Sequence, residues 1–93
     1  MKDSPINKHQ QLMIITAEEC GELTQRCSKM IRKYNTFDEI DEEQRVKFVE
    51  EVGDVFCMIE LIVGHGLTDW KEIHDRCDVK KNKLKIWSDL IDG

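Results

Sequence analysis

A chain of 93 residues builds one domain, because a chain this short has too little surface to bury for a second core. Its single proline, five glycines and 35% charged residues predict an all-α fold, and its net charge of −5 argues against a nucleic-acid partner, which needs a concentrated basic surface. We therefore expect one all-helical domain spanning residues 1–93.

The sequence predicts no membrane attachment. Residues 1–11 contain no apolar run typical of a secretory signal. The most apolar stretch, residues 55–63, is too short to span a bilayer and is interrupted by Glu60. A cytoplasmic location follows as an expectation.

The first helix is expected from Pro5 to about Lys33. Ser4 followed by Pro5 has the order of an N-cap and a first helical residue. Basic residues gather in the last turns, where the helix dipole favours them. The apolar positions recur at helical spacing, at Met13, Cys20, Leu23, Cys27 and Met30.

A connection over residues 35–41 leads to a second helix that begins near Asp41 and ends at Gly64 and Gly66. Thr68 is the expected cap of a third helix, and Leu90 and Ile91 extend or follow it. The apolar stripe of the second helix comprises Phe48, Val52, Val55, Ile59 and Ile62. One face of the third carries Trp70, Ile73, Cys77, Leu84 and Trp87.

Apolar side chains on these helices suggest both burial and self-association. Cys20, Cys27, Cys57 and Cys77 form no CxxC pair and occupy apolar positions, which predicts buried free thiols rather than disulfides or zinc ligands. Core or dimer packing is favoured over base stacking for the two tryptophans. Three helices cannot bury all these stripes alone, so we expect a helical bundle completed in a homodimer or homotetramer.

Each of the two long helices carries a pair of acids three residues apart, and such residues are neighbours on a helix surface. Each pair stands at one end of an apolar row. The first helix has Leu12 and Ile15 before Glu19 and Glu22, and the second has Met58 and Leu61 after Glu51 and Asp54.

When the chain folds back as an antiparallel hairpin about residues 36 and 37, acid falls opposite acid and apolar opposite apolar. Gly21 and Gly53 lie close to the acidic level, where small residues allow the backbones to approach. Four carboxylates on a partly dry surface repel one another, and a divalent cation compensates this repulsion. All-oxygen ligation suits Mg²⁺, with Mn²⁺ as the alternative. A solvated acidic helix face remains the competing interpretation.

The same residues resemble the signature of the MazG-like, all-α nucleoside triphosphate pyrophosphohydrolase superfamily, which reads EExxE, a spacer and ExxD. The resemblance covers roughly residues 10–64. The matching residues are Glu18, Glu19, Glu22, Glu51 and Asp54.

The resemblance implies hydrolysis of nucleoside or deoxynucleoside triphosphates between the α and β phosphates, for house-cleaning or adjustment of nucleotide pools. It implies Glu19, Glu22, Glu51 and Asp54 as Mg²⁺ ligands, with Glu18 as an outer group or a base. Lys80, Lys81 and Asn82 loosely resemble the phosphate-binding segment of the family's third helix. Snorkelling of these lysines to solvent is an equal alternative.

Two other functions compete with the enzyme. The first is a non-catalytic helical module that binds a nucleotide or a protein partner. The second, a di-iron carboxylate site, is disfavoured because the pairs here are Glu-x-x-Glu and Glu-x-x-Asp, where such sites use Glu-x-x-His. The preferred base or sugar is not encoded in any motif of the sequence.

Overall fold

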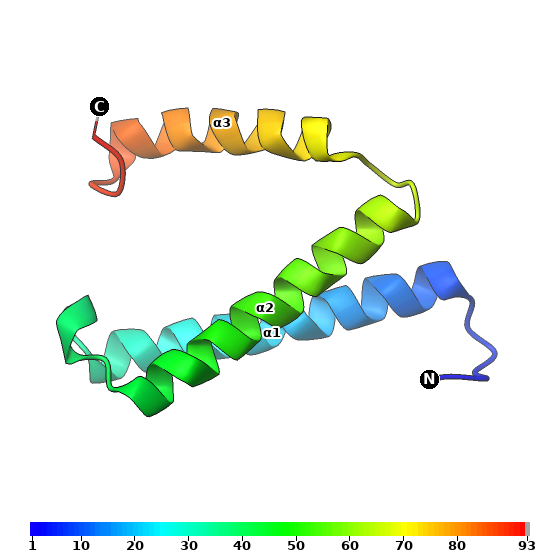
Figure 1. Ribbon diagram of the computed structural model, residues 1–93, viewed down its shortest axis with the longest axis horizontal. Helices are drawn as coiled ribbons and strands as arrows, with labels where there is room; N and C mark the ends of the chain where they lie inside the picture. The colour runs from blue at the N-terminus through cyan, green and yellow to red at the C-terminus, as the bar shows by residue number, and fades with distance from the viewer. Residues whose placement is uncertain (93) are drawn as a thin grey trace. The chain divides into compact units, whose positions relative to one another are not determined.

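The computed structural model describes residues 1–92, which form helices and no strand. In chain order the elements are α1 (Lys8–Lys33), the 3-10 helix η1 (Phe37–Glu39), α2 (Glu42–Gly64) and α3 (Trp70–Trp87) (Figure 1). No helix within this range is apolar over a length sufficient to cross a bilayer. The all-α prediction is confirmed.

The chain divides into two compact units, the first ending at Leu61 and the second beginning at Ile62. The single domain stays a prediction.

Helix α1 begins three residues later than expected, at Lys8. The Asn7 side chain accepts a hydrogen bond from the Gln10 backbone N–H at 2.8 Å, and the Gln10 side chain accepts one from the Asn7 N–H at 2.9 Å. This reciprocal capping box satisfies two N–H groups that a helix start otherwise leaves unpaired. Ser4 instead accepts a bond from the Ile6 N–H within a turn, so the prediction of Ser4 as the cap was wrong.

Helices α1 and α2 form an antiparallel hairpin in the first unit (Figure 1). Helix α1 ends at Lys33 as predicted, and the connection contains η1. Asp41 begins α2 by accepting a bond from the Gln44 N–H at 2.9 Å. The Tyr34 hydroxyl donates to the same carboxylate at 3.0 Å, which ties the end of α1 to the start of α2.

The interior of the first unit is small. Leu12 on α1 and Met58 on α2, each 6% exposed, are the two buried apolar residues within residues 1–92. Both belong to the apolar rows that the hairpin register predicts. Leu61, at the far end of its row, is exposed, and so is Val52 of the predicted stripe. Each apolar row therefore contains one buried residue, and the row on α2 is open at its far end.

Helix α2 ends at the predicted glycines. The Gly66 N–H donates to the Val63 carbonyl and the Leu67 N–H donates to the Ile62 carbonyl, which is the Schellman arrangement. Gly66 has a φ of 81°, a left-handed conformation that glycine adopts without steric cost. This turn closes α2 and leads into the next helix.

Helix α3 begins at Trp70, with Asp69 rather than Thr68 as its cap. The Asp69 side chain accepts a bond from the Glu72 N–H at 2.8 Å, whereas the Thr68 hydroxyl lies 3.2 Å from a Glu72 carboxylate oxygen. The Asp69 carboxylate is therefore the acceptor for the N–H group of the first turn. The predicted cap, Thr68, was wrong by one residue. The helix ends at Trp87.

The predicted burial of several side chains was wrong within this single chain. Trp70 and Trp87 are exposed, which excludes packing in a core of this chain and leaves their dimer packing a prediction. All four cysteines are free, as predicted, but each is exposed. The sequence pattern identifies apolar helix positions, and the chain has too few elements to cover them all.

Candidate metal centre

Three carboxylates converge where α1 and α2 cross in the hairpin. Glu19 and Glu22 are one turn apart on α1, and Asp54 projects from α2. One ligating oxygen from each of these residues lies within 4.8 Å of the others. The antiparallel register therefore brings acid to acid, as the matching of the two pairs predicts.

Glu19 is the most enclosed member of this trio. It is half-buried, whereas Glu22 and Asp54 are exposed. Its Oε2 atom is buried and has no hydrogen-bond partner within residues 1–92. Burial raises the pKa of the Glu19 carboxyl, and the negative charges of Glu22 and Asp54 raise it further. An ionised Glu19 is thus poorly compensated by its surroundings.

Glu51 does not join the trio. Its Oε1 atom lies 3.6 Å from the Nη2 atom of Arg26, and both side chains are mostly enclosed, at 19% and 15% exposed. The expectation of four converging carboxylates is therefore corrected to three. Arg26 stands one turn beyond Glu22 on α1, and its positive charge attracts Glu51 away from the like charges of the trio.

Arg26 is the residue of this region that the sequence analysis missed. Besides its ion pair with Glu51, it donates from Nη1 to the Gln44 side-chain oxygen at 3.2 Å. Its Nε atom is buried and has no partner in the described part of the chain. The signal was its spacing of four residues from Glu22, which places it on the same side of α1.

The remaining predicted residues lie outside the trio. Glu18 is exposed, and its carboxylate is not part of the group of converging oxygens. Lys80, Lys81 and Asn82 are exposed on α3, in the second unit. The Lys80 Nζ atom stands 5.2 Å from the centre of the Trp87 ring, a cation–π contact. Their role toward phosphates stays a prediction.

The two glycines near the acidic level do not mediate a close approach. A Cβ atom added to Gly21 or Gly53 would meet no atom within 4 Å outside its own helix surroundings. The expectation that the backbones approach closely at these glycines was wrong, because the helices leave open space at both positions.

No protein-family model, curated protein or solved structure matches this chain.

The trio fits a hard divalent cation. Its donors are all carboxylate oxygens, the ligand type that Mg²⁺ and Mn²⁺ prefer. The Glu19 oxygen without a partner is an acceptor that a cation satisfies, and three negative charges provide the electrostatic attraction. Glu19, Glu22 and Asp54 are thus the residues that would hold the ion.

Proposed function

We propose that this protein is a Mg²⁺-dependent nucleoside triphosphate pyrophosphohydrolase of the MazG-like kind, which converts (d)NTP to (d)NMP and pyrophosphate. The observation that carries the proposal is the convergence of Glu19, Glu22 and Asp54 around the unpartnered Glu19 oxygen. The resemblance of the two acidic motifs to the superfamily signature supports the same activity. House-cleaning of the nucleotide pool is the corresponding cellular role.

The chain's residues divide into three roles under this proposal. Glu19, Glu22 and Asp54 hold the ion, and Glu51 stays beside them in its ion pair with Arg26. Glu18, exposed beside Glu19, serves as the outer group or base. When bound, Mg²⁺ supplies charge neutralisation on phosphoryl oxygens and lowers the pKa of a water molecule.

We further propose that the protein acts as a dimer or tetramer. Within residues 1–92, sixteen large apolar side chains are exposed and two are buried, a ratio that leaves the helices short of a core. A second copy supplies the missing apolar surface in a helical bundle. Sedimentation equilibrium across a concentration series tests this point, and a folded monomer at every concentration contradicts it.

The activity is tested with a panel of common and damaged triphosphates in the presence of Mg²⁺, with monophosphate and pyrophosphate both measured. We expect stoichiometric release of the two products from at least one member. Glu19→Gln removes a metal ligand and should lower turnover more than about 100-fold. Glu50→Gln is the matched control, because Glu50 is exposed and outside the trio.

Two results contradict the enzyme proposal. One is turnover in Glu19→Gln equal to that of the unaltered chain, and the other is turnover undiminished by excess chelator. Absence of pyrophosphate release from every triphosphate would favour the non-catalytic helical module instead.

A further inference from the structure

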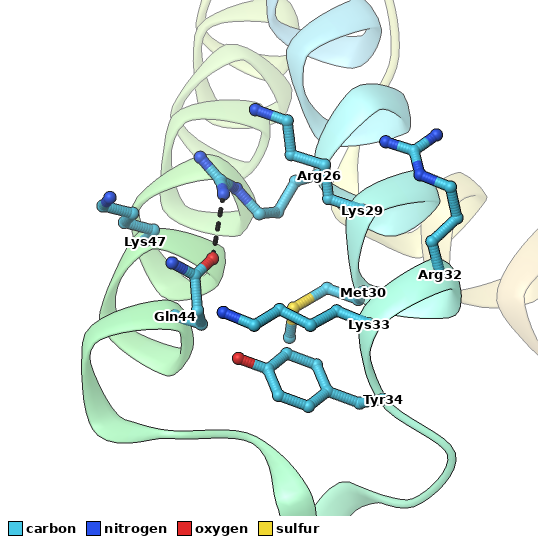
Figure 2. Close-up of a pocket in the computed structure, with 8 residues that line it drawn as sticks. All are labelled: Arg26, Lys29, Met30, Arg32, Lys33, Tyr34, Gln44 and Lys47. Carbon is cyan, nitrogen blue, oxygen red and sulfur yellow. Dashed lines mark hydrogen bonds between the residues drawn. The ribbon is translucent and has the colours of Figure 1, made fainter.

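A pocket of about 440 Å³ opens between the last turns of α1 and the first turns of α2, within the first unit (Figure 2). We call it the basic pocket, because five of its eight lining residues are cationic and none is acidic. Its lining consists of Arg26, Lys29, Met30, Arg32, Lys33, Tyr34, Gln44 and Lys47.

The basic pocket is a local reversal of charge in an acidic protein. The chain carries a net charge of −5, yet residues 26–33 contain four cations and no acid. Lys47 adds a fifth cation from α2. Cations concentrated around a concave surface attract an anion more strongly than the same charges dispersed over a convex one.

Most of these cations have weak partners or none. Lys29 has no carboxylate within 4.0 Å in the described part of the chain, and Arg32 bonds only to the Ser28 hydroxyl. Lys33 lies 3.9 Å from Asp41 and Lys47 lies 3.3 Å from Glu43, both at exposed positions. Exposed pairs of this kind contribute little, so an incoming anion replaces them at small cost.

The geometry gives the basic pocket directed donors. Figure 2 shows the side chains of Arg26 and Lys33 reaching from α1 toward Gln44 on α2, with the Tyr34 hydroxyl on the same side. The Arg26 Nε atom is a buried donor without a partner among residues 1–92. A planar guanidinium and flanking ammonium groups are the donors that bind phosphate oxygens in proteins.

We propose that the basic pocket binds a phosphate-chain anion of pyrophosphate size, with Lys29 and Lys33 as its principal donors and Arg26, which is paired with Glu51, as a further cation of its lining. The site is separate from the carboxylate trio and requires no metal ion. The binding proposal therefore goes beyond the proposed hydrolysis, and its test does not depend on that activity.

Isothermal titration calorimetry of the full chain with inorganic pyrophosphate, in excess chelator, tests the proposal. We expect saturable one-to-one binding that weakens as salt is raised. Lys29→Gln combined with Lys33→Gln should weaken it at least about tenfold, because two charged donors are lost. Both side chains are exposed, so the helices should form as before, which circular dichroism checks.

Lys2→Gln combined with Lys8→Gln is the matched control, because it removes the same charge from exposed positions before and at the start of α1, outside the basic pocket. We expect this variant to bind pyrophosphate within about twofold of the unaltered chain. A nucleoside triphosphate forms a second arm of the titration. Tighter binding than pyrophosphate assigns the pocket to a nucleotide's phosphate tail, and weaker binding assigns it to free pyrophosphate.

Three results overturn the proposal. They are absence of pyrophosphate binding by the unaltered chain, equal binding by the pocket variant, and a loss as large in the Lys2 and Lys8 control as in the pocket variant. Because the titration contains no free metal, a failure of the hydrolysis assay leaves its outcome unchanged, and the two proposals fail separately.

Discussion

Arg26 on α1 and Glu51 on α2 form an ion pair, with 3.6 Å between Nη2 and Oε1, and this pair divides two regions of opposite charge. The carboxylate trio with Glu19 lies before it along α1, and the basic pocket with Lys33 lies beyond it. Arg26 therefore both restrains a fourth carboxylate and contributes to a cationic surface.

The ion pair between Arg26 and Glu51 should stabilise the hairpin of α1 and α2. Arg26→Met retains much of the side-chain volume and removes the charge, leaving Glu51 enclosed without a partner. We expect the free energy of unfolding to fall by about 2 kcal/mol, between the values typical of surface and fully buried pairs. Urea denaturation followed by circular dichroism measures the change.

Arg45→Met provides the control for this substitution. Arg45 pairs with Glu42 one turn away on α2, at an exposed position, and should lower stability by less than Arg26→Met. The double variant Arg26→Met with Glu51→Gln should be more stable than the sum of the single effects predicts, because neither charge is then left alone. Additive losses would show that Arg26 acts only through packing.

The raised pKa of Glu19 predicts a dependence of stability on pH in metal-free protein. A carboxyl whose pKa is higher in the folded chain binds its proton more tightly there, so its contribution is favourable at low pH. That contribution is lost as pH rises from the ordinary value of 4.5 through the raised value, because burial and the charges of Glu22 and Asp54 oppose ionisation. Urea midpoints measured in chelator between pH 4 and pH 8 should reveal the decline.

Glu19→Gln should flatten this part of the pH profile, since glutamine does not ionise. Addition of Mg²⁺ or Mn²⁺ at neutral pH should raise the midpoint of the unaltered chain and leave that of Glu19→Gln nearly unchanged. A profile identical in both proteins would show that the trio is solvated like any acidic helix face.

Local spacing in the sequence predicts much of this fold. The end of α1, the start of α2 and its glycine termination follow from charges and turn residues that act within a few positions. The start of α1 is missed because Ser4-Pro5 suggests a cap, while Asn7 and Gln10 make the reciprocal bonds that stabilise the first turn. Two competing local signals differ by three residues, and only hydrogen-bond geometry decides between them.

The site is predicted only in part, for an electrostatic reason. Helical spacing and hairpin register identify Glu19, Glu22 and Asp54 as neighbours, and these the structure brings together. Spacing alone does not predict which neighbour a long charged side chain will contact, and the Glu51 carboxylate pairs with Arg26. Burial of the cysteines is mispredicted because helical periodicity identifies a face without specifying what covers it.

The cap at the start of α2 should be sensitive to acid. Hydrogen bonds from the Gln44 N–H and then from Tyr34 lower the pKa of Asp41, so its stabilising contribution is present above 3.8 and is lost as pH falls through the lower folded value. Asp41→Ala removes the acceptor and should increase hydrogen exchange at the Gln44 amide. Asp41→Asn retains an acceptor and should preserve most of the protection. Equal exchange in both variants would contradict a capping role.

The exposed thiols provide a direct test of self-association. Cys27 lies with Cys20, Leu23 and Ile31 on an exposed face of α1, and apolar positions of this kind are those that a second copy should cover. We expect a thiol reagent to modify Cys27 quickly in dilute protein and more slowly as the protein concentration rises, because the associated form excludes the reagent. Peptide mass spectrometry measures the rate, with the urea-unfolded chain as the reference for full access. A rate that stays constant while sedimentation shows association would place the interface on another face of the helices.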